Sequence, residues 1–140
     1  MNVYLDASVL VALLMVDALT ARADAFFRQS TPVPIVSDFA AIEFASAVSR
    51  RVRTGDVSAD EARRAFSAFD LWTARVALRE ETMTADIRAA ETFLRRLDLT
   101  LRTADALNIA IAQRIRAALV TFDRKMAANA RALGVPVVAA

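Results

Sequence analysis

Short apolar runs alternate with longer helical patterns along this chain of 140 residues. Such runs, bounded by turn-forming and helix-capping residues, are typical of buried strands. Strands that are joined by helices pair in parallel through right-handed crossovers. We therefore expect an α/β fold: one three-layer α/β/α domain spanning residues 1–140, with a parallel sheet at its centre. The expected strands are Val3–Leu5, Ile35–Val36, Val76–Glu80, Ala118–Phe122 and Val135–Val138, of which the third has the weakest pattern.

Polar residues with short side chains mark where the helices are expected to begin. Such side chains accept hydrogen bonds from the free backbone N–H groups of a first helical turn. Before the second strand, Pro32 and Pro34 are expected to bracket a turn. The expected caps are Asp6, Asp17, Ser37 or Asp38, Ser58, Thr103 and Asp123.

The composition excludes several kinds of active site. The chain has no cysteine, which excludes disulfides, thiolate metal sites and a cysteine nucleophile. It also has no histidine, which removes the usual general base and the usual zinc ligand. Any metal ion must therefore be held by oxygen ligands, which favours Mg²⁺ or Mn²⁺.

Charge and hydropathy bear on which partners the protein binds and on whether it spans a membrane. Of the 18 basic residues only Lys125 is lysine, and arginine suits bidentate contacts to phosphate, although a biased genomic composition would give the same count. The apolar run at Val9–Val16 is read as a core helix, and no run reaches the roughly 18 residues that span a bilayer. We expect a soluble, cytoplasmic protein without a membrane partner.

Three acidic residues lie where an expected strand meets the next helix or where a helix begins. They are Asp6 after the first strand, Asp105 in the first turn after Thr103, and Asp123 after Ala118–Phe122. Each could simply cap a helix or complement the helix dipole. Together they fall at the carboxyl edge of the expected sheet, where open parallel sheets bind ligands.

Glu43 differs from these three acids because it lies in the middle of an apolar helical segment, FAAIEFASAV, with no basic residue within a turn. Burying an unpaired carboxylate costs several kcal/mol unless a partner compensates it. Glu43 either lies on a solvated edge of the helix or faces the other three acids. Four carboxylates in one place would repel one another, and a divalent cation would relieve that repulsion.

The ordered set of these residues resembles the PIN domain family, and within it the VapC ribonuclease toxins of bacterial toxin–antitoxin pairs. The likeness is carried by Asp6 in YLDASVL, Glu43 in the third helix, Asp105 in RTADALNIAIA, and Asp123 in TFD eighteen residues later. No one of these motifs is specific, but the four in this order, covering essentially the whole chain, are.

This resemblance implies a five-stranded parallel sheet and a Mg²⁺- or Mn²⁺-dependent endoribonuclease that acts on structured RNA such as tRNA or rRNA. It implies that Asp6, Glu43, Asp105 and Asp123 are the catalytic, metal-binding acids, with Ser8 and Thr121 as supporting polar residues. It also implies a homodimer that a small VapB-like antitoxin inhibits, in a heterotetramer or a larger complex.

Several points stay open at this stage. Some family members carry a further acid after the one matched by Asp123, whereas Arg124 and Lys125 follow it here, so one or two metal ions are possible. Arg102, Arg124 and Lys125 are candidate RNA contacts, and the arginines at 50, 51 and 53 either hold RNA or form a solvated face. The alternatives are a non-catalytic RNA- or protein-binding module on the same fold, or a metal-dependent nuclease that acts on DNA.

Overall fold

The computed structural model describes residues 1–139 and confirms the α/β prediction. Within that range the chain forms one five-stranded sheet, and every strand pair in it is parallel. The strands are β1 (Asn2–Leu5), β2 (Val33–Ser37), β3 (Leu78–Glu80), β4 (Ala118–Val120) and β5 (Val137–Val138). The helices are α1 (Ala7–Leu14), α2 (Thr20–Ser30), α3 (Asp38–Arg53), α4 (Ala59–Arg75), α5 (Thr84–Arg95), α6 (Thr103–Arg114) and α7 (Arg124–Ala132).

The strand order is β3-β2-β1-β4-β5, so β1 lies at the centre of the sheet. Tyr4 of β1 pairs with Ile35 of β2 on one side and with Leu119 of β4 on the other. The chain builds outward from β1 in one direction and then returns to place β4 on its other side. Ligands of open α/β sheets bind outside the carboxyl ends of the strands at such a switch point. The connections after β1 and β4 therefore define where a site is expected.

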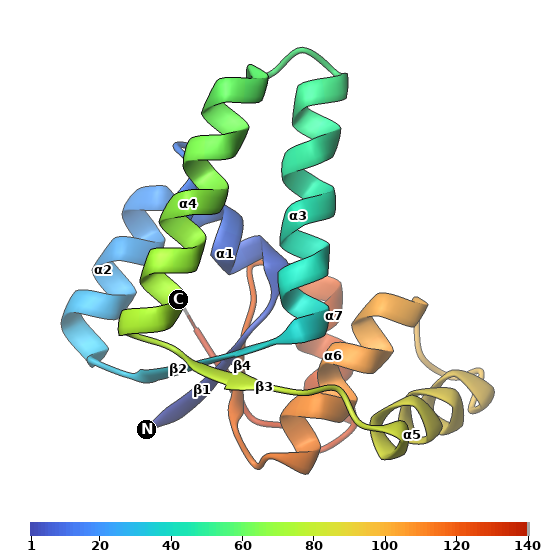
Figure 1. Ribbon diagram of the computed structural model, residues 1–140. Helices are drawn as coiled ribbons and strands as arrows, with labels where there is room; N and C mark the ends of the chain where they lie inside the picture. The colour runs from blue at the N-terminus through green and yellow to red at the C-terminus, as the bar shows by residue number, and fades with distance from the viewer. Residues whose placement is uncertain (140) are drawn as a thin grey trace.

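Helices cover both faces of the sheet, because successive strand side chains point to opposite faces (Figure 1). Val3 and Leu5 of β1 pack into a core with α1, α2, α3 and α4. Tyr4, between them, packs into a second core with α5, α6 and α7. The three-layer α/β/α arrangement follows from these two apolar cores.

Helices α3 and α4 form a long hairpin that stands away from the sheet in Figure 1. Ser37 caps α3 by accepting the N–H of Ala40 at 2.9 Å, directly after β2 ends. The turn at the far end places Gly55 at φ 81°, a backbone conformation that glycine adopts without a steric penalty. One side of α3 therefore starts at the carboxyl edge of the sheet and continues outward for four turns, past any ligand bound there.

Three local predictions differ from the structure. Pro34 does not bracket a turn but lies within β2, where pairing with β3 begins only at the next residue, Ile35, so the missing N–H of proline interrupts no bond to β3. Helix α2 is capped at Leu19, with Asp17 accepting the Leu19 N–H at 2.8 Å. Helix α6 has Arg102 at its cap position, and Thr103 is its first residue.

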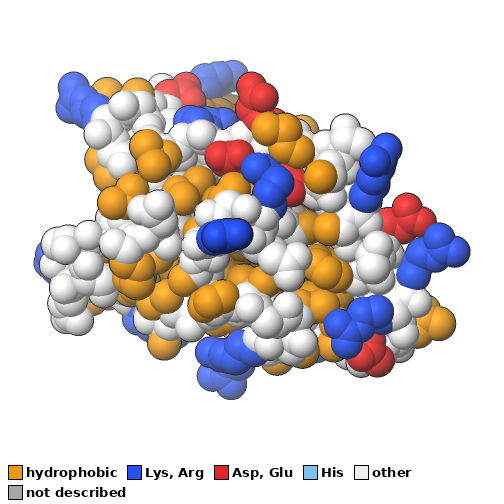
Figure 2. Space-filling view, turned by 90° about the horizontal axis from the view of Figure 1, so that it is seen from below, with side chains coloured by type: hydrophobic (Ala, Val, Ile, Leu, Met, Phe, Trp, Pro, Cys, Tyr) orange, Lys and Arg blue, Asp and Glu red, His pale blue; other side chains and the backbone are white. Residues whose placement is uncertain are grey.

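Several large apolar side chains remain exposed in the described range, among them Val16, Ile42, Ile87 and Leu97. Figure 2 shows apolar side chains across the middle of one face, with Lys and Arg side chains both among them and around its margins. Within residues 1–139, none of the helices is long and apolar enough to cross a membrane.

An arginine at the end of α6 ties that helix to α5 and β3. The Arg114 guanidinium donates to both carboxylate oxygens of Asp86, at 2.7 and 3.0 Å, and to Glu80 at 3.0 Å. Asp86 is only 1% exposed, so its charge depends on this bidentate partner. The contacts fix α6, the helix that carries Asp105 and Asn108.

Replacing Arg114 by methionine should lower the free energy of unfolding by about 3 kcal/mol, because the buried Asp86 carboxylate loses its counter-charge. Denaturant unfolding followed by circular dichroism measures this. The matched control is Arg95→Met, which removes an exposed ion pair to Glu91 on α5 and should change the free energy by less than about 0.5 kcal/mol. Equal losses in the two variants would show that Arg114 does not stabilise the fold through Asp86.

Candidate functional site

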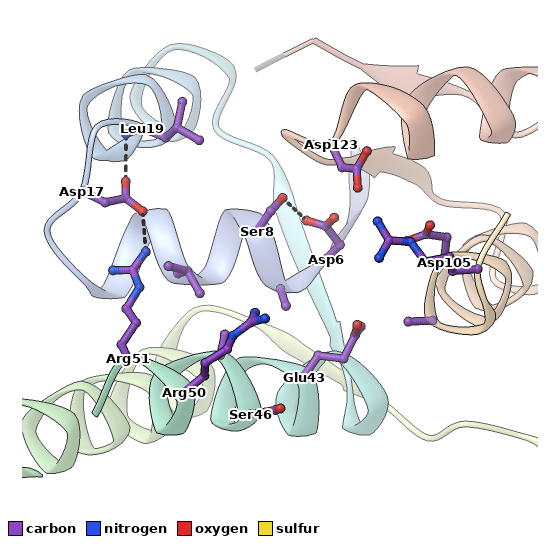
Figure 3. Close-up of a pocket in the computed structure, with 15 residues that line it drawn as sticks. Asp6, Ser8, Asp17, Leu19, Glu43, Ser46, Arg50, Arg51, Asp105 and Asp123 are labelled. Carbon is purple, nitrogen blue, oxygen red and sulfur yellow. Dashed lines mark hydrogen bonds and ion pairs between the residues drawn. The ribbon is translucent and has the colours of Figure 1, made fainter. Parts of the chain in front are cut away.

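The structure brings the four predicted acids to one pocket at the carboxyl edge of the sheet, where Figure 3 shows their side chains around the same space. Asp6 caps α1 directly after β1, and Asp123 caps α7 after β4, so these two flank the switch point. Asp105 lies in the first turn of α6, and Glu43 lies in the second turn of α3. The pocket has a volume of about 590 Å³.

Asp6 is the most constrained of the four acids. One carboxylate oxygen accepts the Ser8 hydroxyl at 2.6 Å and the Val9 N–H at 3.3 Å, and the other accepts the Thr121 hydroxyl at 2.5 Å. The residue is 5% exposed. Burial raises the pKa of Asp6, the nearby Asp123 raises it further, and the three hydrogen bonds oppose that rise. The carboxylate is thus held in one orientation before any ligand arrives.

Ser8 and Thr121 also hold the connection after β4 against the connection after β1. The Ser8 hydroxyl accepts the N–H of Phe122 at 3.0 Å, and the Thr121 hydroxyl accepts the N–H of Asp123 at 3.0 Å. Each hydroxyl donates its own hydrogen to Asp6. These bonds position Asp123 relative to Asp6. The two residues therefore support the site by holding its acids in place.

Glu43 receives a partner that sequence reasoning did not find. The side-chain amide of Asn108 on α6 donates to the Glu43 carboxylate at 2.6 Å and to the Ala104 carbonyl at 3.1 Å. The Asn108 amide oxygen in turn accepts the Tyr4 hydroxyl at 2.5 Å, and that hydroxyl lies 2.7 Å from the Ser37 hydroxyl.

The direction of donation in this series of hydrogen bonds is fixed. Tyr4 has one hydroxyl hydrogen, which it donates to Asn108, so Ser37 must donate to Tyr4. Turning the Asn108 amide over would place its oxygen against the Glu43 carboxylate and the Ala104 carbonyl, and these would repel it. The Ser37–Tyr4–Asn108 chain therefore aims an N–H donor at Glu43 and fixes where its carboxylate lies.

Asn108 and Tyr4 carried a weak signal in the sequence. Asn108 is the one amide in the apolar run ALNIAIA, three residues after Asp105 and so on the same side of α6. A buried amide in such a run requires hydrogen-bond partners. Tyr4 reads only as an apolar strand residue, because its two polar partners come from distant parts of the chain.

The acids repel one another in the folded protein. Burial raises the pKa of Glu43, and the charges of Asp6 and Asp105 raise it further, against the hydrogen bond from Asn108. Burial also raises the pKa of Asp105, to which Asp123 adds. The raised pKa values of these two carboxyls and of Asp6 mean that the pocket disfavours their charged forms.

The donor set of the pocket fits a hard divalent cation. Its four acids offer only oxygen ligands, which Mg²⁺ and Mn²⁺ prefer, and a cation would relieve their repulsion. In residues 1–139 no three acidic side chains are gathered tightly enough to enclose an ion by themselves. Mg²⁺ in proteins is commonly held by one or two carboxylates with water completing its shell. A partly hydrated ion therefore suits this pocket.

The predicted basic contacts separate into two groups. Arg102 lines the pocket, as do Arg50 and Arg51 of α3. Arg124 and Lys125 are exposed in the first turn of α7 and are not among the residues that line it.

A family model described as the PIN domain matches residues 3–132. The chain belongs to the PIN domain family. No protein with a curated description matches this PIN domain chain.

Solved structures share its fold over nearly the whole length. The Mycobacterium tuberculosis toxin VapC20, described as cleaving the sarcin–ricin loop, is similar with a TM-score of 0.75 and 22% identity, over 97% of this chain and 98% of that one. VapBC2 from Rickettsia felis, bound to a DNA fragment from its promoter, gives a TM-score of 0.70 at 15% identity, over 99% and 98% of the two chains. VapBC-1 from nontypeable Haemophilus influenzae gives 0.70 at 14% identity, over 99% and 98%.

Glu43→Gln should raise the melting temperature of the metal-free protein at neutral pH. The pKa of Glu43 is raised in the folded chain above its unfolded value of about 4.3, so the folded chain binds more protons between the two values and its stability falls as pH rises through them. Glutamine carries no charge and keeps an oxygen for Asn108. Thermal melts in EDTA should therefore separate the variant from the parent at pH 7 and bring the two together below about pH 4.

The control for this effect is Glu91→Gln on α5, an exposed glutamate outside the pocket. It should not gain stability at pH 7. A Glu43→Gln variant that is no more stable than its parent at pH 7 would contradict mutual repulsion in the pocket.

Proposed function

We propose that this PIN domain protein is a Mg²⁺- or Mn²⁺-dependent endoribonuclease, the toxin of a VapBC-like toxin–antitoxin pair. The observation that carries the proposal is the convergence of Asp6, Glu43, Asp105 and Asp123 on one pocket at the switch point of the sheet. Neighbouring carboxylates that repel one another are stabilised by a bound cation. A cation held by carboxylates can in turn bind and activate a phosphate group.

The four acids would hold the cation, and the rest of the site keeps them in position. When bound, a divalent cation supplies a water of lowered pKa and stabilises charge that develops on the phosphate. Asp6 is held by Ser8 and Thr121, and Glu43 by Asn108, so neither carboxylate needs to reorganise. One oxygen of Asp123 accepts the N–H of Met126, which leaves the other to face the pocket.

Hydrolysis of a phosphodiester also requires a proton acceptor for the attacking water. The chain has no histidine or cysteine, so a carboxylate is the side chain best suited to accept a proton here. Asp105 is less buried than Asp6, whose two oxygens already accept hydrogen bonds from Ser8, Val9 and Thr121, so Asp105 is the better placed of the two to accept a proton. We assign it that role beside its share in holding the cation.

RNA is the proposed substrate, and tRNA or rRNA the proposed target class. VapC20, to which the chain is similar over nearly its whole length, is described as cleaving the sarcin–ricin loop. A pocket that recognises phosphate through a cation does not itself distinguish RNA from DNA, because the sugar hydroxyl is the distinguishing group. The test below therefore includes both.

We also propose a VapB-like antitoxin as partner, with the toxin as a homodimer in a heterotetramer or a larger complex. Solved structures of the same fold include VapBC2 and VapBC-1, and another is described as a toxin–antitoxin complex. Exposed apolar side chains such as Val16 and Ile42 supply surface of the kind that partners cover.

Purified protein should cut total cellular RNA into discrete fragments with Mg²⁺ or Mn²⁺ and should not cut it with EDTA. Asp6→Asn and Asp105→Asn should each lower the rate by at least about a hundredfold, because each removes a charge that holds the cation. Electrophoresis of timed samples measures this, with single-stranded DNA as a second substrate. Glu91→Gln, an exposed acid outside the pocket, should cut at the parental rate.

Two results would contradict the proposal. Cleavage that persists in EDTA would exclude the metal. Folded protein that leaves RNA intact with either metal would favour a non-catalytic binding module.

A further inference from the structure

The pocket of the four acids extends along α3 to a part of the opposite charge. Beyond Glu43, the residues of α3 that line it are Ser46, Ala47, Arg50 and Arg51. They recur at three- and four-residue intervals, so they form one stripe on the side of α3 that faces α1. Figure 3 shows this stripe running from Glu43 to Arg51 beneath α1.

Arg51 and Arg50 differ in what they contact. Arg51 lies 3.6 Å from the carboxylate of Asp17, so its charge already has a partner. Arg50 is exposed and lines the pocket, and its side chain makes no hydrogen bond or ion pair with any residue in the described range. In Figure 3 its side chain points across the pocket toward α1. A guanidinium placed in this way has its donors available to a ligand.

Helix geometry brings this guanidinium back toward the acids. Glu43 and Arg50 are two turns apart, about 10 Å along the helix axis. Side chains of a helix lean toward its N-terminus, which for Arg50 is the direction of Glu43. A long arginine side chain therefore reaches the space beside the acid cluster.

We infer that Arg50 binds the phosphate of a nucleotide next to the one that is cut, so that α3 supplies both a cation ligand and a phosphate clamp. This inference rests on the proposed function and names a substrate contact within that site. Arginine matches a phosphate with a fork of parallel N–H donors. A nucleic-acid strand that enters the acidic pocket needs such a contact, because the acids repel its backbone wherever no cation shields them.

A phosphate contact positions the strand without reading its sequence. The contribution of Arg50 should therefore be the same for RNAs of different sequence and should also appear with single-stranded DNA. Its removal should not weaken the hold of the acids on a cation, because Arg50 is not one of the ligands and its charge repels a cation.

The test measures binding of a short single-stranded RNA to the full chain in the Glu43→Gln background, which prevents cleavage during the measurement. Fluorescence anisotropy at several salt concentrations compares Arg50→Gln with Arg53→Gln. Arg53 is the matched control, because it lies on the same helix, contacts Ser49 at 2.9 Å and does not line the pocket. Arg50→Lys tests whether charge without the fork suffices.

Arg50→Gln should weaken RNA binding about tenfold and lower the slope of log K against log salt by about 0.7, the value for one phosphate contact on a single strand. Arg53→Gln should change affinity less than about twofold, and Arg50→Lys should restore part of the loss. Mn²⁺ affinity of Arg50→Gln in the chain with native Glu43, measured by calorimetry, should be no lower than that of the parent.

Equal RNA affinities for the Arg50→Gln and Arg53→Gln variants would overturn the inference. So would a change in Mn²⁺ affinity that accounts for the loss, because Arg50 would then act on the acids and not on phosphate. Failure of the proposed function looks different: the chain with native Glu43 binds RNA but does not cut it, and the comparison of Arg50 with Arg53 still decides the inference. A protein that binds no RNA overturns both.

Discussion

Electrostatic repulsion between acidic side chains is the constraint on which this structure depends. The fold places Asp6, Glu43, Asp105 and Asp123 around one pocket, and burial raises the pKa of the first three. Such an arrangement costs stability unless a cation occupies it, and proteins keep costly polar groups of this kind mainly at functional sites. The rest of the molecule holds these acids in place against their repulsion.

Two sets of hydrogen bonds do this holding, and they come from opposite sides of the sheet. Ser8 and Thr121 join the ends of β1 and β4 to Asp6. Tyr4, whose side chain lies in the other core, donates a hydrogen bond to Asn108, which in turn donates one to Glu43. Further away, Arg114 fixes α6 through Asp86 and Glu80, so the helix that carries Asp105 and Asn108 keeps its position. The site is thus built into the core.

Much of this site was predictable from sequence, because its signals are local. A short apolar strand followed by a capping acid is visible in a few residues, and parallel strands bring their carboxyl ends to one edge, which placed Asp6 and Asp123 correctly. Glu43 was predictable because a charge in an apolar helix requires a partner. What sequence did not supply is that partner: Asn108 is 65 residues away on α6, which covers the other face of the sheet from α3, and only the complete fold brings the two side chains together at the edge of the sheet. The prediction of a turn at Pro34 was wrong for a similar reason, because its place within β2 depends on where β3 starts to pair with that strand.

The central claim is that these four acids hold a divalent cation, and a crystal of the protein soaked in Mn²⁺ tests it most directly. Anomalous scattering recorded at the manganese absorption edge locates the ion without any assumption about activity. The account predicts a peak in the pocket, within coordination distance of carboxylate oxygens from at least two of Asp6, Glu43, Asp105 and Asp123. A well-diffracting soaked crystal with no peak there, or with manganese only elsewhere on the surface, would contradict it.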